Sequence, residues 1–158
     1  MKEASLIEAI RNHPFSKEFL PPHLDKLAEL AQLARFERDQ IIFREGDESS
    51  FFYLLLSGKV ALEVTALSRT LRVQTVGAGE ELGWSSAIPV RGKQFQARAL
   101  GTVKAIVFDG ARLREACALD CAFGYAMMKR LLVVVAGRLQ ATRMQLLDLY
   151  SPHGAKEA

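Results

Sequence analysis

Apolar positions follow a helical spacing at both ends of the chain and a strand-like spacing between them. Near the N-terminus they recur at Leu6, Ile7 and Ile10 and stop before His13. A second helical segment begins at Pro21-Pro22, where proline suits the first helical turn. Its apolar stripe consists of Leu24, Leu27, Leu30 and Leu33. The pattern predicts two short helices before the strands begin.

Short apolar or alternating runs, separated by glycine-containing turns, fill the middle of the chain. They are Ile41–Phe43, Phe51–Leu56, Val60–Thr65, Leu71–Val76, Lys93–Ala99 and Thr102–Phe108. Six short strands with regular turn signals are typical of a small antiparallel barrel or sandwich. Ser57-Gly58, between two of these runs, predicts a hairpin turn. If Lys93 starts a strand, it shares an inward face with Phe95, Ala97 and Ala99, whereas Arg98 faces outward.

The helical period returns after Phe108. Asp109 is placed to cap a short helix that extends to about Cys117, and Asp120 lies near the start of a longer helix. In the longer helix a heptad stripe comprises Tyr125, Met128, Leu132, Val135, Leu139, Thr142, Leu146 and Leu149. Thirty helical residues extend about 45 Å, which is more than a small barrel needs to cover one side.

Two interpretations of this stripe remain open, because it can pack on the chain's own barrel or on the same stripe of a second copy. The second is favoured, since Met127, Leu131 and Val134 offer a separate apolar face for the barrel. We therefore expect a homodimer formed through residues 120–150.

The expected fold class is α+β and mainly β, an antiparallel β-roll or jelly-roll barrel flanked by N-terminal helices and a long C-terminal helix. The expected units are N-terminal helices over 1–34, a β-roll over 35–109, a short helix plus the long dimerisation helix over 110–150, and a tail over 151–158.

Length and composition narrow the class of protein. A chain of 158 residues suits one domain. Its 21 basic residues are scattered among 18 acidic ones, which disfavours a nucleic-acid groove despite the net charge of +3. No apolar run approaches the roughly 20 residues of a membrane span, and no secretory signal is visible, so we expect a cytoplasmic protein. Cys117 and Cys121 lack further ligands nearby, so they are expected to be small buried side chains rather than a metal site.

Three motifs in order carry a resemblance to a known family. They are IFREGD at residues 42–47, FYLLLSGKV at 52–60 and GEELG at 79–83. Over about residues 24–150 the chain resembles the cyclic nucleotide-binding domain of the catabolite activator and cyclic-nucleotide receptor family. The resemblance implies a β-roll with a phosphate-binding cassette that Gly83 opens. It also implies that ligand binding repositions the hinge between the two final helices, here residues 117–120.

The cassette of this family is a glycine-led turn whose backbone amides point at the cyclic phosphate. In the family a Glu directly after the glycine accepts the ribose hydroxyl, and an Arg at the start of the next strand pairs with the phosphate. Here Trp84 stands in place of that Glu and accepts no hydrogen bond. Lys93 falls near the position of the Arg with Gln94 beside it, and Arg91 is an equally credible phosphate partner.

Two interpretations of the cassette follow. In the first, Ser85, Ser86, the helix-end amides and Lys93 or Arg91 hold a small anion, and Trp84 stacks on an aromatic group or a sugar face. In the second, Trp84 fills the ribose space and the pocket is vestigial. In either case we expect cyclic AMP to bind weakly or not at all.

The function expected from the sequence is that of a non-enzymatic sensor or regulatory module. Its ligand would be a cyclic nucleotide or another small anion, and no other cofactor is expected. The alternative is a ligand-free interaction module. The segment from Gly83 to Ala87 comes within one residue of a nucleophile-elbow motif but lacks its structural context. Because we expect no DNA-binding domain after the long helix, the output would pass through a protein partner.

Overall fold

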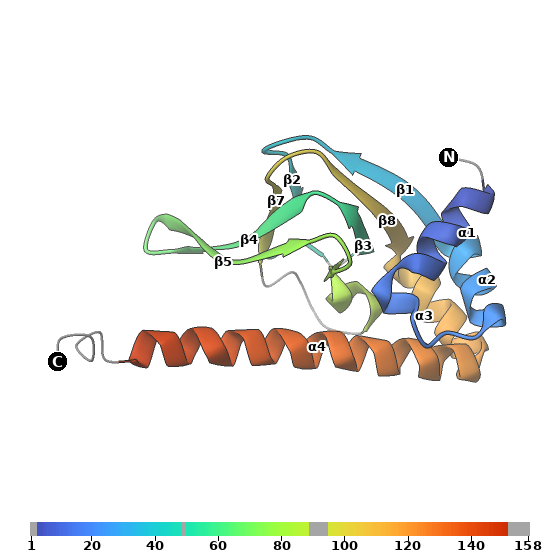
Figure 1. Cartoon of the computed structure of the whole chain (residues 1–158). Helices are drawn as coiled ribbons and strands as arrows, with labels where there is room; N and C mark the ends of the chain where they lie inside the picture. The colour runs from blue at the N-terminus through green and yellow to red at the C-terminus, as the bar shows by residue number, and fades with distance from the viewer. Residues whose placement is uncertain (1–2, 49, 89–94, 152–158) are drawn as a thin grey trace.

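Two facing antiparallel sheets form the body of the protein, and one long helix runs along its side (Figure 1). The computed structural model describes residues 3–48, 50–88 and 95–151. The helices are α1 Glu3–Asn12, η1 Pro14–Ser16, α2 Pro21–Leu30, η2 Trp84–Ala87, α3 Gly110–Leu119 and α4 Cys121–Tyr150. The strands are β1 Ala31–Phe36, β2 Ile41–Phe43, β3 Phe51–Ser57, β4 Lys59–Ala66, β5 Arg69–Gly77, β6 Glu81–Leu82, β7 Gln96–Ala99 and β8 Val103–Asp109.

The strand order confirms the expected β-roll class. One sheet has the order β1-β8-β3-β6 and the other β2-β7-β4-β5, and every pairing is antiparallel. Side chains such as Leu55, Val60, Val76 and Ala105 are fully buried between the two sheets. All six runs picked out in the sequence are strands at least in part. β1 and β6 lie outside those runs.

The second N-terminal helix ends earlier than its leucine stripe predicts. α2 ends at Leu30, and Ala31 adopts an extended backbone, so the prediction that the stripe continues through Leu33 was wrong. The reason is tertiary. Residues 31–36 pair with residues 103–108 of β8, and this ladder satisfies their backbone groups. The start of the roll therefore lies within residues 1–34, which the sequence assigned to helices.

The prediction of a hairpin at Ser57-Gly58 was also wrong. β3 pairs with β6 and β8, whereas β4 pairs with β5 and β7, so Gly58 lies at a corner between the sheets. Its φ is +86°, and a Cβ there would lie 2.3 Å from the Thr102 carbonyl oxygen. The hairpin that does form joins β4 to β5 through Leu67 and Ser68, both at positive φ. A type I′ turn made by these two residues lacks the glycine or asparagine that usually reveals it.

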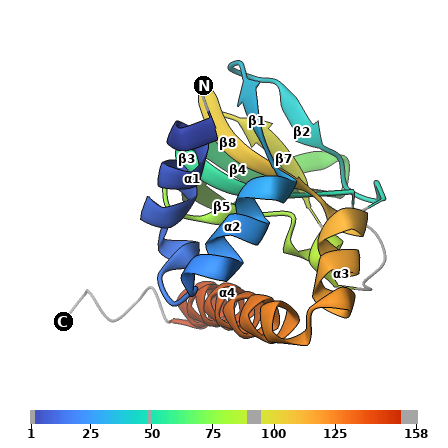
Figure 2. The same ribbon diagram turned by 90° about the vertical axis from the view of Figure 1, so that its right-hand side faces the viewer.

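The two C-terminal helices begin at the aspartates that the sequence predicted as caps. The Asp109 carboxylate accepts from the Arg112 backbone N–H, and the Asp120 carboxylate accepts from that of Phe123, both at 3.1 Å. In Figure 2, α1, α2 and α3 lie over the N-terminal end of α4. Cys121, which the sequence predicted to be buried, is exposed at the first residue of α4.

The side of α4 that packs on the rest of the chain is the one that the sequence reserved for the barrel. Met127, Leu131 and Val134 are buried there, together with Phe123. The heptad stripe lies elsewhere on the helix, and most of its apolar members are exposed. Within the described residues no helix is long and apolar enough to cross a membrane.

A polar contact at η1 ties α4 to the N-terminal helices and to the roll. His13 donates from Nε2 to the Leu55 carbonyl at 3.1 Å, and its Nδ1 accepts from the Phe15 backbone N–H at 3.1 Å. Arg130 of α4 donates to the Phe15 carbonyl at 2.8 Å and to the Pro14 carbonyl at 3.1 Å. Because both nitrogens of the His13 ring are engaged, this arrangement requires the neutral imidazole.

The state of His13 predicts how stability changes with pH. Burial, aided by the charge of Arg130, lowers the pKa of His13 below 6.5, although the carbonyls of Leu55 and Glu80 oppose this shift. Below pH 6.5 the unfolded chain therefore binds a proton that the folded chain does not. We expect the free energy of unfolding to fall as the pH decreases through 6.5.

Urea unfolding at about pH 7.5 and about pH 5.5 measures this loss directly. His13→Asn should lose part of the difference between the two pH values, whereas the control His23→Gln should keep all of it. A His13→Asn variant with the full pH dependence of the wild type would contradict the assignment.

Candidate functional site

The segment after Gly83 has the conformation that the family resemblance implies, a glycine turn followed by one short helix. Gly83 lies in the left-handed region, with φ +71° and ψ 28°, and precedes η2. The Gly83 carbonyl accepts from the Ser86 backbone N–H at 3.0 Å and from Ser86 Oγ at 2.8 Å. Ser86 is fully buried, and Ser85 is nearly so. The Ser86 hydroxyl therefore stabilises the turn.

This cassette packs directly on α3. A Cβ built on Gly110 would lie 2.6 Å from the Ser86 carbonyl oxygen, and the Gly110 backbone N–H donates to the Ser50 carbonyl at 2.8 Å. Arg114, one turn further along α3, donates to the same Ser86 carbonyl. A displacement of η2 must therefore displace the start of α3 or break these contacts.

A cavity of about 80 Å³ lies between the roll, the cassette and α4. Most of its wall is apolar. The described residues that line it are Phe43, Leu62, Gln74, Glu81, Leu82, Gly83, Trp84, Ser85, Phe95, Arg138 and Thr142. Of the predicted site residues, Gly83, Trp84 and Ser85 line it and Ser86 does not. Arg91, Lys93 and Gln94 lie outside the described residues.

Trp84 has two neighbours that matter for function. Its side chain is half-buried and packs against the apolar core cluster that contains Phe52 and Phe108. It also lines the cavity beside Gly83. The residue thus stands where the family places a carboxylate, and it makes that part of the wall apolar.

Sequence reasoning missed Arg138, the cation that α4 contributes to the cavity. Its Nη2 donates to the Glu81 carbonyl, while its Nη1 is buried and has no hydrogen-bond partner among the described residues. Burial lowers the pKa of Arg138, an effect that the charges of Glu80 and Glu81 oppose. Burial raises the pKa of Glu81, and the charge of Arg138 opposes that shift. Arg138 could have been found from its spacing, because it comes four residues after Val134 on the buried side of α4.

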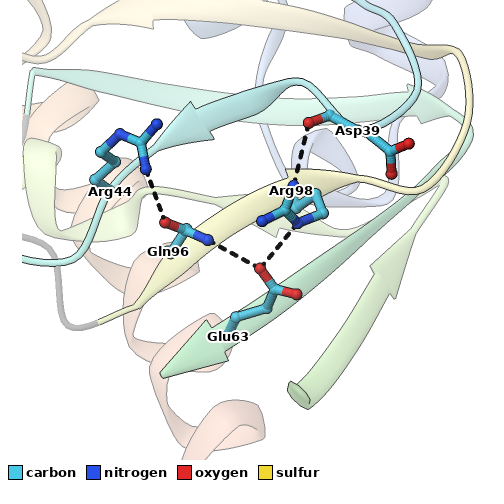
Figure 3. Close-up of polar contacts among 5 residues, drawn as sticks. All are labelled: Asp39, Arg44, Glu63, Gln96 and Arg98. Atoms are coloured by element: carbon cyan, nitrogen blue, oxygen red, sulfur yellow. Dashed lines mark hydrogen bonds and ion pairs between the residues drawn. The ribbon is translucent and has the colours of Figure 1, made fainter. Parts of the chain in front are cut away.

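Side chains of β7, the strand after the cassette, alternate between an inner and an outer face of the sheet, as predicted. Ala97 and Ala99 are fully buried, and Phe95 packs against the core between the sheets. Arg98 lies on the opposite face, where its Nε donates to Glu63 at 3.2 Å (Figure 3). The same Glu63 oxygen accepts from Gln96 at 3.0 Å. Arg98 is therefore held away from the cavity and is not a candidate ligand contact.

This outer network continues to both sides of Glu63. Arg44 donates to Gln96 at 3.3 Å, and Arg98 also donates to the Asp39 carbonyl at 3.3 Å (Figure 3). Its polar groups satisfy one another around the buried Glu63, which identifies it as a structural network. Within the described ranges no group of three or more His, Cys, Asp or Glu side chains is arranged to hold a metal ion.

Comparison with known families gives one match. A sequence profile described as "Cyclic nucleotide-binding domain" matches residues 33–120, more than half of the chain. A search of curated protein sequences found no match.

Solved structures of the same architecture are similar over most of the chain. A structure from Geobacter metallireducens GS-15, assigned as a cyclic nucleotide-binding protein, is 29% identical, with a TM-score of 0.75 over 84% of this chain and 96% of that one. The Thermus thermophilus catabolite activator protein is 23% identical, with a TM-score of 0.69 over 86% of this chain and 62% of that one. The regulatory subunit of a cyclic AMP-independent protein kinase A from Trypanosoma brucei is 20% identical, with a TM-score of 0.70 over 87% of this chain and 46% of that one.

The space around two glycines predicts opposite effects for their substitution by alanine. One of them, Gly110, lies at the contact between the cassette and α3, and the other, Gly137, lies in α4. Gly110→Ala forces a methyl group against the Ser86 carbonyl and should lower the free energy of unfolding by about 1–3 kcal/mol. Gly137→Ala meets no atom within 4 Å in the interior of α4 and should raise it by about 0.5–1 kcal/mol. Denaturant unfolding of both variants measures the pair. If the two variants had equal free energies of unfolding, η2 would move aside for the new methyl group without cost, contrary to this prediction.

Proposed function

The chain belongs to the cyclic nucleotide-binding domain family, and we propose that it is a cytoplasmic regulatory module that binds a small anionic ligand in its β-roll. A ligand bound in the roll would change the position of α4, and a partner protein would respond to that change. One observation carries this proposal. The cavity is bounded jointly by the cassette residues Gly83 and Trp84 and by Arg138 and Thr142 of α4. A ligand in the cavity would touch both the sensing segment and the output helix.

A second path from the cavity to α4 runs through α3. The cassette contacts α3 at Gly110 and Arg114. At the junction of α3 and α4, a Cβ on Gly124 would lie 2.5 Å from the Cys117 carbonyl oxygen, so the two helices touch there through their backbones. These close contacts support the proposal that residues 117–120 act as the hinge, because tightly packed helices move together or change partners.

The expected ligand is not cyclic AMP itself. Trp84 replaces the carboxylate that would accept the ribose hydroxyl, and the cavity of about 80 Å³ is small for a nucleotide. The Trypanosoma brucei subunit of the same fold belongs to a cyclic AMP-independent protein kinase A, so this fold does not by itself imply regulation by cyclic AMP.

We propose a non-enzymatic role. Among the described residues no histidine lines the cavity, and His13 is engaged at both ring nitrogens at η1. Among the described residues the cavity therefore lacks the histidine base that most often activates a serine nucleophile.

A ligand-free interaction module is the second candidate function. It is favoured by Trp84, whose side chain packs on the core and occupies one wall of a small cavity. In this case the ordered roll would serve only to present α4. The two functions differ in one observable, the response of the fluorescence of Trp84, the single tryptophan, to small anions.

We further propose that the module is a homodimer through residues 120–150. The heptad stripe exposes 71% of Tyr125, 69% of Leu132 and 79% of Leu149, and half of Leu139 and Leu146. A row of apolar side chains of this length marks an interaction surface, and its heptad period suits a second identical helix.

Cyclic AMP should bind with a dissociation constant well above about 1 μM, because the missing hydrogen bond to the ribose is worth about 1.5–3 kcal/mol. Isothermal titration of the full chain measures it. Trp84→Glu should bind cyclic AMP about tenfold to a hundredfold more tightly than Trp84→Leu, since both remove the indole and only the first adds a carboxylate. Wild-type affinity near or below about 1 μM would contradict this account.

Sedimentation equilibrium should give about twice the chain mass for the wild type. Leu139→Asp places a charge in the proposed seam and should give the monomer mass. The adjacent exposed substitution Gln140→Asp is the matched control, and it should stay dimeric. A wild-type monomer, or dissociation of both variants alike, would count against the seam.

A further inference from the structure

Arg138 carries a positive charge that the described residues leave only partly paired. One of its terminal nitrogens, Nη2, donates to the Glu81 carbonyl, and the other, Nη1, is sealed from solvent without a partner. Among the described residues Arg138 forms no ion pair. A buried guanidinium nitrogen without an acceptor is costly, so an acceptor brought to Nη1 would be bound favourably.

The two nearby carboxylates do not fill that role. Glu80 is exposed, and its carboxylate accepts from the Gly77 backbone N–H at 2.7 Å. Glu81 is close enough to affect the pKa of Arg138, but it forms no ion pair with it. Arg130, the other cation nearby on α4, is engaged with the carbonyls of η1.

The rest of the cavity is suited to an apolar body. Phe43, Leu62, Leu82 and Phe95 line it together with Trp84. From these observations we propose that Arg138, rather than a residue of the cassette, binds the anionic group of the ligand, and that the ligand is a small monocarboxylic acid with an aliphatic or aromatic body. This inference rests on the proposed function, because it names the ligand class of the same site.

A single carboxylate fits this position better than a phosphate. One N–H of Nη2 is held by the Glu81 carbonyl, and Nη1 is the terminal nitrogen that has no acceptor among the described residues. Glu81 lines the same cavity, so a dianionic phosphomonoester would meet more repulsion from its charge than a monoanion would. A compact acid also suits the volume of about 80 Å³.

Access to Nη1 requires a movement, and this connects binding with the output helix. A groove of about 340 Å³ runs along α4 on the other side of Arg138. The groove and the cavity share the lining residues Gln74, Glu81 and Arg138, so these side chains form a common wall. A carboxylate reaches Nη1 only when that wall opens, through a shift of α4 or of the Arg138 side chain.

The experiment uses the full chain with pairs of probes that differ in charge. Phenylacetate is compared with 2-phenylethanol and hexanoate with 1-hexanol, and phenyl phosphate and cyclic AMP serve as phosphate probes. The readouts are Trp84 fluorescence and the melting temperature. The variants are Arg138→Met, which removes the charge, Arg138→Lys, which keeps it, and Arg143→Met, an exposed control on the same helix.

We expect at least one carboxylate, but neither alcohol, to raise the melting temperature and change the fluorescence of Trp84. Arg138→Met should weaken that binding about tenfold to a hundredfold, as expected for loss of a charge-assisted hydrogen bond. Arg138→Lys should retain part of it, and Arg143→Met should bind like the wild type. Without ligand, Arg138→Met should melt close to the wild type, because it removes an uncompensated buried charge.

Each contrary result has a distinct meaning. Carboxylate binding that survives in Arg138→Met overturns the role of Arg138, and binding of a phosphate probe overturns the carboxylate class. Both results leave the sensor function standing. Equal binding of acid and alcohol overturns the carboxylate class. The last result is that no probe, at concentrations up to about 10 mM, changes either the Trp84 fluorescence or the melting temperature of a cooperatively folded protein. That result overturns both this inference and the proposed ligand-binding function.

Discussion

The burial of one side of α4 against the rest of the chain is the constraint on which the other features depend. Phe123, Met127, Leu131 and Val134 are nearly or fully buried there, and this fixes the rotation of the helix about its own axis. Once that rotation is fixed, Arg130 points to the carbonyls of η1, and Arg138 points to the cavity. The heptad stripe is left facing outward for the same reason. The side of α4 that is buried therefore determines three features. They are the contact of Arg130 with η1, the wall of the cavity and the proposed dimer interface.

Local signals in the sequence were sufficient for most of the fold. The aspartate caps of α3 and α4 were predictable because capping depends on residues three apart. The errors arose where partners distant in the chain decide the outcome. Leu33 continues a helical stripe, yet its backbone pairs with β8, and Gly58 signals a turn without saying which strands it joins. The hairpin at Leu67-Ser68 was invisible because these residues adopt positive φ without the usual glycine.

The candidate site was predictable only in its cassette half. Gly83, Trp84 and Ser85 were found because the glycine motif is contiguous, and all three line the cavity. Arg138 and Thr142 belong to the same cavity but were assigned to a helix face, since nothing in a single sequence says which roll residues that face will meet. Thr142 illustrates the ambiguity well. The heptad pattern counts it as an interruption of the dimer stripe, whereas the structure places it on the cavity wall.

A ligand moves a helix only if it binds the two positions of that helix with different free energies. Contacts confined to Gly83 and Ser85 would act on α4 only indirectly, through the packing of the cassette on α3. A contact with Arg138 differs, because that residue belongs to α4 and its Nη1 is inaccessible in the position seen here. This nitrogen is buried and has no partner among the described residues, which makes this position of α4 less stable than its apolar contacts alone would suggest. An anion that reaches Nη1 would remove this cost only in a second position of α4. It would therefore shift the equilibrium of the helix toward that second position.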